Sequence, residues 1–260
     1  MILISNDDGP ASPGLHSLIR ELSDLDEVSF SIPEGQRSAA SMSLTFHKPL
    51  RVKRVKIRGI SGYAVSGSPA DAVSIALLKL FDERPRVLVS GINIGDNTGV
   101  QDIFASGTVA AAIQAAIMGV PAVAFSTEIG EQFVFSAGGA RGNFARAATV
   151  AKTIVKYVMD EGLPKDVQFL NVNFPSEIND ETEVLITWPA TTKYDNYVVK
   201  RIDPRGKPYY WLWGKRLDRY PEGSDAHALF DLRAISITPM NVDLSVRNVD
   251  LLNLVRAIRP

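Results

Sequence analysis

Apolar residues in the first two thirds of the chain alternate between short continuous runs and helical patterns. Residues 2–4 form an apolar run, which is typical of a strand buried on both faces. Residues 14–22 place leucine and isoleucine on one face at helical spacing. The two patterns keep alternating to about residue 174. This alternation predicts an α/β fold with a mostly parallel sheet covered by helices, a Rossmann-like doubly wound core.

The other elements of this core follow from period-two runs and from helix-start motifs. Residues 68–71 read Ser-Pro-Ala-Asp, in which a capping Ser, a first-turn Pro and an Asp suit a helix start. Residues 44–66 are rich in Val and Ile, and we expect antiparallel extended segments there. The remaining predicted strands are residues 27–32, 87–90, 121–126 and 168–174, and the predicted helices are residues 68–81, 106–118 and 143–159.

The pattern changes after about residue 182. Short strand-like runs separated by Pro and Gly predict a protruding β-hairpin or small β-subdomain, followed by a returning strand and a final helix. We therefore predict a Rossmann-like core at residues 1–182. We expect residues 183–260 to form an extension that partly completes the core and is used in oligomerisation. The segments are strands at residues 183–188, 197–202, 209–213 and 234–238, and a helix at residues 249–258.

Composition narrows the possible chemistry. The formal net charge of −1 over 260 residues argues against a broad surface for polymeric nucleic acid or for a membrane. The sequence contains no cysteine and three histidines, so a thiolate site is excluded and a multi-histidine zinc site is disfavoured. A bound metal would be a hard cation with oxygen ligands. Neither a signal peptide nor a long apolar run is visible, and we expect a cytoplasmic protein.

An acidic pair, Asp7 and Asp8, directly follows the first predicted strand. Ligands gather at the carboxyl ends of parallel strands. Adjacent carboxylates repel each other unless a cation lies beside them, and Mg²⁺ or Mn²⁺ suits such a pair with neutral oxygens and water. An Asp-Gly sequence is also common in ordinary turns, so the pair alone does not decide between the two interpretations.

Two further loops offer neutral oxygen atoms. Ser38 follows the second predicted strand, and its hydroxyl could be a metal ligand. The glycine-rich residues 90–99 contain Asn93, which supplies a carbonyl oxygen, and Asn97, which could donate to a phosphate oxygen. Each segment also fits a plain polar loop.

A fourth motif, Ser106-Gly107-Thr108, opens an alanine-rich helix. Free N–H groups and the helix dipole make a helix start a natural anion site, although simple capping by Ser106 explains the same residues. Taken together, the four motifs predict an oxygen-only cation site beside an anion cradle. A metal there would polarise a phosphoryl oxygen and activate a water molecule, while the cradle would hold negative charge.

The ordered motifs resemble the stationary-phase survival protein SurE family over nearly the whole chain. The matching stretches are residues 6–9, 36–45, 67–71, 90–97 and 106–112, with further likeness at residues 203–206 and 236–239. The resemblance implies a 5′-nucleotidase or acid phosphatase that hydrolyses nucleoside monophosphates, sometimes with exopolyphosphatase activity. It also implies a homodimer or homotetramer formed by exchange of C-terminal elements.

The resemblance also implies roles for particular residues and one divalent ion, Mg²⁺ or Mn²⁺, per subunit. The implied metal ligands are Asp7, Asp8, Ser38 and Asn93, of which Asp7 and Asp8 are catalytic. The implied phosphate contacts are Asn97, Ser106, Gly107 and Thr108.

Three alternative hypotheses about the function remain open. A haloacid-dehalogenase-type phosphatase would carry an Asp-x-Asp nucleophile motif, whereas these acids are adjacent. A non-catalytic nucleotide-binding module is conceivable, although neither a G-x-G-x-x-G nor a P-loop motif is present. The aromatic residues 209–213, with Tyr209, Trp211 and Trp213 on one strand face, could serve assembly, which we treat as an addition to catalysis.

Overall fold

A nine-stranded sheet forms the centre of the part of the chain that the structure, a computed structural model, describes: residues 1–129, 141–247 and 250–258. Its strand order is β3-β4-β2-β1-β5-β6-β7-β11-β8. The strands are β1 (Ile2–Ser5), β2 (Val28–Pro33), β3 (Val52–Ile57), β4 (Ile60–Val65), β5 (Val87–Ile94), β6 (Ala122–Thr127), β7 (Phe169–Phe174), β8 (Val184–Ile186) and β11 (Ile235–Met240).

The direction of the strands creates one point at which a ligand crevice is expected. The six strands from β4 to β7 are parallel, while β3 and β11 run antiparallel to their neighbours β4 and β7. The chain first builds outward from β1 to β2 and β4, and then returns to the other side of β1 with β5. Such a reversal leaves a crevice outside the carboxyl ends of the two strands, here β1 and β5.

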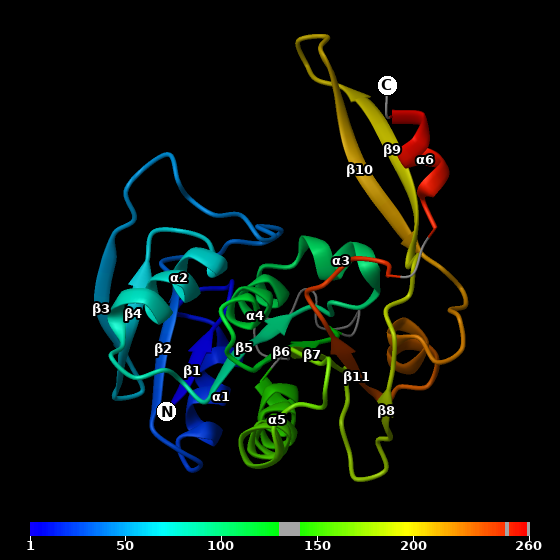
Figure 1. Ribbon diagram of the computed structural model, residues 1–260. Coiled ribbons are helices and arrows are strands. Elements are labelled where there is room, and N and C mark those ends of the chain that lie inside the picture. Colours follow the sequence, from blue (N-terminus) through cyan, green and yellow to red (C-terminus); the bar gives the residue numbers. More distant parts are fainter. Residues whose placement is uncertain (130–140, 248–249, 259–260) are drawn as a thin grey trace.

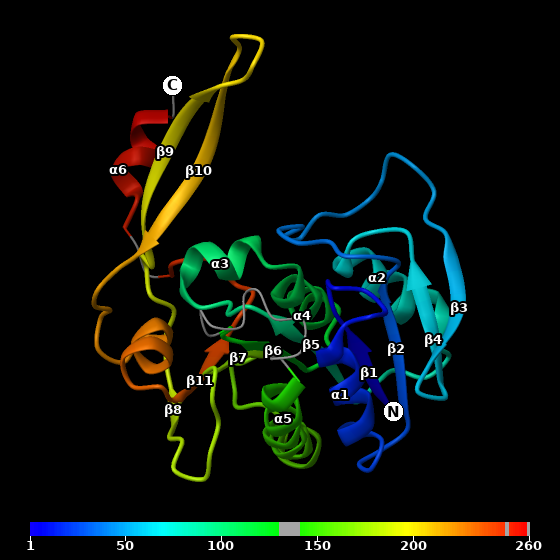
Figure 2. The same ribbon diagram turned by 180° about the vertical axis from the view of Figure 1, so that it is seen from behind.

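Helices cover both faces of the sheet (Figures 1 and 2). One apolar core packs α1 (Pro13–Leu22) and α5 (Arg141–Glu161) against the side chains of Ile2 and Ile4. A second core packs α2 (Pro69–Ile75) and α4 (Gly107–Ile117) against Leu3 on the opposite face. Helix α3 (Gly99–Ala105) directly precedes α4.

The C-terminal extension contributes to the sheet and also leaves it. Strands β9 (Tyr194–Ile202) and β10 (Pro208–Arg216) form an antiparallel hairpin that projects well away from the sheet (Figures 1 and 2). The chain then returns through η3 (His227–Asp231) to β11 and ends in α6 (Leu252–Ile258). Tyr209 and Trp211 pack edge to face at 6.5 Å, as their shared strand face predicts.

The predicted fold class is confirmed, and three local expectations need correction. Residues 44–51 are not a strand, and at the start of this segment the Asp71 carboxylate accepts hydrogen bonds from the N–H and the hydroxyl of Thr45. The helix expected over 68–81 is α2 followed by the π-helical turn η1 (Ala76–Leu80). Helix α3 was not predicted. The final helix begins at Leu252, and the expected start at Val249 lies outside the described residues.

Among the described residues, no single helix is long and apolar enough to cross a membrane. Helices α3 and α4 reach the required length and composition only as a pair, with a bend of 73° between them.

Candidate functional site

A tight turn at the end of β1 presents Asp7 and Asp8 at the crevice between β1 and β5. The Asn6 side chain closes this turn, since its Nδ2 donates to the Gly9 carbonyl oxygen at 2.9 Å and its Oδ1 accepts from the Gly9 N–H at 3.2 Å. Gly9 has a φ of +84° and lies against the backbone of Gly35. A side chain at position 9 would therefore meet both backbone strain and a steric clash.

Asp7 is buried against the start of α4. Its Oδ1 accepts a hydrogen bond from the Thr108 hydroxyl. A Cβ atom on Gly107 would lie 2.8 Å from the Asp7 Cβ, so glycine is required for this close approach. Burial raises the pKa of the Asp7 carboxyl, and the hydrogen bond from Thr108 offsets part of that increase.

Asp8 lies beside the end of β5. The Ser12 hydroxyl donates to its Oδ2 at 3.5 Å, and the backbone N–H of Ile94 donates to the same carboxylate. Burial and, second, the charge of Asp7 raise the pKa of Asp8 to about 6. Neither Asp7 nor Asp8 forms an ion pair with a described residue. The two carboxylates therefore repel each other in a partly dry site.

The chain neighbours of Ser38 and Asn93, Arg37 and Ile94, contact the residues of this acidic pair. The backbone N–H of Arg37 donates to the Asp7 carbonyl oxygen at 2.7 Å, which brings the exposed Ser38 to the same turn. Asn93 directly precedes Ile94 at the end of β5. Its Nδ2 donates to the Gly95 carbonyl oxygen at 2.8 Å, so its own Oδ1 stays available as an acceptor.

The loop that carries Ser38 is anchored at its far end. The Ser41 hydroxyl donates to the Phe104 carbonyl oxygen at 2.6 Å, and the Ser41 N–H donates to the carbonyl oxygen of Ala105 at 3.0 Å. Asp71, in the first turn of α2, accepts hydrogen bonds from the N–H and the hydroxyl of Thr45. Residues 36–45 are thus tied to the C-terminal end of α3 and to the first turn of α2.

The start of α4 supplies donors next to Asp7. The Ser106 hydroxyl oxygen caps the helix by accepting from the Val109 N–H at 3.1 Å. The N–H groups of Gly107 and Thr108, in the first turn, have no acceptor within the helix. Together with the helix dipole, these two donors and the Ser106 hydroxyl proton can bind an anion.

Asn97 lies at the carboxyl ends of the next two strands, β6 and β7. Its Nδ2 donates to the Ser126 hydroxyl oxygen at 2.7 Å, and its backbone N–H donates to the Oδ1 of Asn173 at 2.7 Å. Its carbonyl oxygen accepts from the Nδ2 of Asn171 at 2.9 Å. The three partners were not singled out in the sequence. The signal was present, because Asn171 and Asn173 alternate with apolar residues in β7 and so share one face.

The donor set fits a hard divalent cation. Among the residues that the structure describes, no group of three or more His, Asp and Glu side chains is placed to hold a metal. A cation at Asp7 and Asp8 would therefore take its remaining ligands from neutral oxygens and water, a mixture that suits Mg²⁺ or Mn²⁺. The unpaired charges of these carboxylates favour such an ion.

Comparisons with known proteins show the family of this chain. The sequence model of the family described as "Survival protein SurE" matches residues 2–196. The chain belongs to the SurE family. A relative from Thermofilum pendens named "5'-nucleotidase SurE" is 45% identical over 93% of this chain and 90% of its own length. A relative of the same name from Methanocella arvoryzae is 38% identical, over 98% of this chain and 97% of its own.

A solved structure supports the fold of this SurE-family chain independently. The crystal structure of the SurE protein from Aquifex aeolicus superimposes with a TM-score of 0.80 at 34% sequence identity. The match covers 99% of this chain and 97% of the other, so it includes the C-terminal extension as well as the sheet.

Proposed function

We propose that this chain is a divalent-metal-dependent phosphomonoesterase that hydrolyses nucleoside 5′-monophosphates, with the broader specificity of an acid phosphatase. The observation that carries the proposal is a pair of carboxylates that no described cation contacts: Asp7, which is buried against the N-terminus of α4, and the half-buried Asp8 beside it. A cation site next to an anion site suits a metal-bound phosphate ester. The relatives named 5′-nucleotidase give the substrate class.

The proposed metal site uses four side chains. Asp7 and Asp8 hold one Mg²⁺ or Mn²⁺ ion, and Ser38 and Asn93 offer neutral oxygen ligands. When bound, the ion would polarise the phosphoryl group and lower the pKa of a water molecule that attacks phosphorus. The bond from phosphorus to the ester oxygen breaks, which releases the nucleoside and inorganic phosphate.

The proposed phosphate site uses the start of α4 and Asn97. The N–H groups of Gly107 and Thr108 and the Ser106 hydroxyl can donate to phosphate oxygens, where they would stabilise the negative charge of the transition state. The Thr108 hydroxyl is already donated to Asp7, so Thr108 would serve the phosphate through its backbone. Asn97 has a second amide hydrogen besides the one directed at Ser126.

Oligomer formation and location complete the proposal. Exposed apolar side chains cluster on the hairpin, and a surface of this kind marks an interaction site more often than a free surface. A homodimer or homotetramer that uses residues 183–260 would cover these side chains, which include Tyr197, Val198, Tyr210, Leu212 and Trp213. Light scattering coupled to size exclusion measures the assembly. The proposed location is the cytoplasm, where nucleoside monophosphates are formed.

One substrate panel tests the activity. Phosphate release is measured from nucleoside 5′-monophosphates, p-nitrophenyl phosphate and, as a control, the diester bis(p-nitrophenyl) phosphate, with Mg²⁺, Mn²⁺, Co²⁺ or EDTA across pH. We expect monoester hydrolysis that EDTA stops and added metal restores. Hydrolysis that EDTA leaves unchanged would show that the reaction needs no metal ion. The absence of phosphate release from every monoester would favour a non-catalytic nucleotide-binding module.

A further inference from the structure

Lys193 is a buried lysine of the C-terminal extension whose side chain points back toward the site. The residue is 2% exposed. Its ammonium group forms ion pairs with Asp96 and Asp102 and lies 3.5 Å from the carbonyl oxygen of Thr98. An ammonium group has three N–H donors, so all three are directed at residues 96–102.

Lys193 carries a positive charge at neutral pH. Burial alone would lower the pKa of the ammonium group, but the charges of Asp96 and Asp102 outweigh burial and hold that pKa above its usual value. The ammonium also faces the rings of Tyr194 and Phe230, at 5.0 and 5.5 Å from their centroids. These contacts add a cation–π attraction to the ion pairs.

The segment that Lys193 holds joins two parts of the proposed phosphate site. Asp96 immediately precedes Asn97, and the Asp96 carboxylate also accepts hydrogen bonds from the N–H and the hydroxyl of Thr98. At the other end, the carbonyl oxygen of Asp102 accepts the Ser106 N–H at 2.8 Å. One cation therefore fixes the turn around Asn97 and the residue that caps α4.

Other residues of the extension hold the same segment. The Asp225 carboxylate accepts the Gly99 N–H at 2.8 Å and also the Ala190 N–H at 2.8 Å. The Ala190 carbonyl oxygen in turn accepts the Val100 N–H at 2.9 Å. Residues 96–102 thus take much of their hydrogen bonding from chain segments about a hundred positions away.

We propose that Lys193 is a positioning residue for phosphate binding, which fixes residues 96–102 so that Asn97 and the start of α4 can receive the substrate phosphate together. The inference rests on the proposed function. Lys193 acts on the substrate through Asp96 and Asp102, and it leaves the metal ligands Asp7 and Asp8 untouched.

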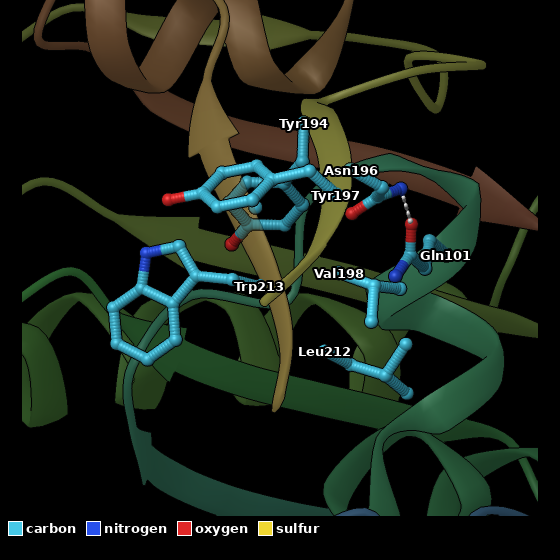
Figure 3. Close-up of a pocket in the computed structure, with 8 residues that line it drawn as sticks. Gln101, Tyr194, Asn196, Tyr197, Val198, Leu212 and Trp213 are labelled. Atoms are coloured by element: carbon cyan, nitrogen blue, oxygen red, sulfur yellow. Dashed lines mark hydrogen bonds between the residues drawn. The ribbon is translucent and has the colours of Figure 1, made fainter. Parts of the chain in front are cut away.

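The hairpin is coupled to the same segment. Tyr194 is the first residue of β9, and its hydroxyl donates to Asp102 at 3.3 Å. The Nδ2 of Asn196 donates to the Oε1 of Gln101 at 3.1 Å, as Figure 3 shows. These residues line a pocket of about 600 Å³ at the hairpin base. Lys193 directly precedes β9, so a displacement of the hairpin would also displace the Lys193 ammonium group and, with it, the proposed phosphate site.

Three variants separate positioning from folding. Lys193→Met leaves two carboxylates unpaired in a largely buried site, which is strongly destabilising in general. The triple variant Lys193→Met/Asp96→Asn/Asp102→Asn removes those charges as well, and Asp102→Asn alone keeps every side chain near its original volume. The matched control is Lys152→Met, which breaks an ion pair with Asp24 on the face of the sheet that α1 and α5 cover.

Three readouts are compared with the wild-type protein in full-length variants. Hydrogen exchange measures protection of the Asn97 amide, and steady-state kinetics with Mn²⁺ measures hydrolysis of a nucleoside 5′-monophosphate. Calorimetric titration measures Mn²⁺ affinity. We expect at least tenfold faster exchange and at least tenfold lower kcat/KM in the triple variant, with smaller changes in Asp102→Asn. Mn²⁺ affinity should stay within threefold, and Lys152→Met should match the wild type in all three measurements.

The outcomes distinguish this inference from the proposed function. Wild-type exchange and kcat/KM in both the triple variant and Asp102→Asn would overturn the role of Lys193. If the wild-type protein hydrolyses no monoester, the proposed function fails, while the exchange of the Asn97 amide still reports on positioning. A loss of Mn²⁺ affinity equal to the loss of kcat/KM would also contradict the inference, because it would indicate general disruption of the site.

Discussion

Two acidic pairs lie at the carboxyl edge of the same sheet, and only one of them has a cation from the protein. Asp96 and Asp102 share the ammonium group of Lys193. Asp7 and Asp8 form no ion pair with a described residue, and burial raises the pKa of both carboxyls. The fold thus places a cation of its own between the carboxylates of one pair and no described cation beside the other.

We infer from this difference a structural role for Asp96 and Asp102 and a functional role for Asp7 and Asp8. Burying charge costs free energy unless a partner compensates it, and a fixed lysine does this permanently. A pair without such a partner can bind an ion from solution, and that ion can also bind a substrate. The comparison predicts that changes at Asp7 and Asp8 affect activity more than stability.

Removal of a carboxylate from the pair Asp7 and Asp8, which has no cation from the described protein, should have the largest effect on activity. We expect Asp7→Asn and Asp8→Ala each to lower kcat/KM by about 10³-fold or more, because metal binding contributes several kcal/mol to such reactions. Circular dichroism and thermal unfolding should show that the fold is retained. Normal metal-dependent activity in both variants would contradict a role of Asp7 and Asp8 in metal binding.

Removal of the hydrogen bond that supports Asp7 should have an intermediate effect. Thr108→Val takes away the hydroxyl that donates to the Asp7 carboxylate. We expect a loss of roughly 10- to 100-fold in Mn²⁺ affinity, as for other groups that orient a metal ligand. Thr108→Ser keeps the hydroxyl and is the matched control. Calorimetric titration measures the affinity, and equal values for the two variants would remove this role from Thr108.

The raised pKa of Asp8 predicts how the stability of the metal-free protein depends on pH. The carboxyl has a pKa of about 6 in the fold and 3.8 in the unfolded chain. The folded state therefore binds more protons between these values, and its stability falls as pH rises through them. Asp8→Asn removes this penalty. We expect it to be more stable than the wild type at pH 7 by about 1–2 kcal/mol, a value reduced for the partial exposure of Asp8.

Urea unfolding in EDTA measures that difference. It should shrink toward zero below about pH 4, where Asp8 is protonated in both states. Saturating Mn²⁺ should reverse the order of stability, since the wild type binds the ion more tightly. A wild-type protein that is the more stable one without metal at pH 7 would contradict the description of an uncompensated pair.

Ser106→Ala should have the smallest effect. It removes the cap of α4, which costs about 1 kcal/mol of stability. The N–H groups of Gly107 and Thr108 remain, so we expect kcat/KM to fall by less than about tenfold. Thermal unfolding and kinetics measure both effects, and a loss as large as that of Asp8→Ala would assign the Ser106 hydroxyl a direct role in the chemistry.

The pair Asp7 and Asp8 could be predicted from the sequence, whereas the pair Asp96 and Asp102 could not, for a physical reason. Asp7 and Asp8 directly follow a strand, so local pattern and sheet geometry place them at the crevice. The partner of Asp96 and Asp102 lies more than ninety positions away, and nothing near Lys193 in the sequence indicates its burial. Alternating patterns define strands and helices, whereas such long-range ion pairs depend on the finished fold.

The same distinction explains the corrections to the fold. Residues 44–51 contain no Val or Ile and include Pro49, so the strand composition of the longer segment 44–66 comes from residues 52–66, and tertiary hydrogen bonds from Thr45 to Asp71 fix the path of the first part. Helix α3 is short and begins at a glycine, so its own sequence gives a weak helical signal, and contacts from residues 190 and 225 support its first turn.

Diffraction from crystals grown with Mn²⁺ would show which of the two acidic pairs binds the ion. We expect one anomalous peak per subunit in coordination contact with the carboxylates of Asp7 and Asp8, and no peak between Asp96 and Asp102, where Lys193 already occupies the position. Crystals with no peak at Asp7 and Asp8, or with the ion bound at other residues, would contradict this expectation.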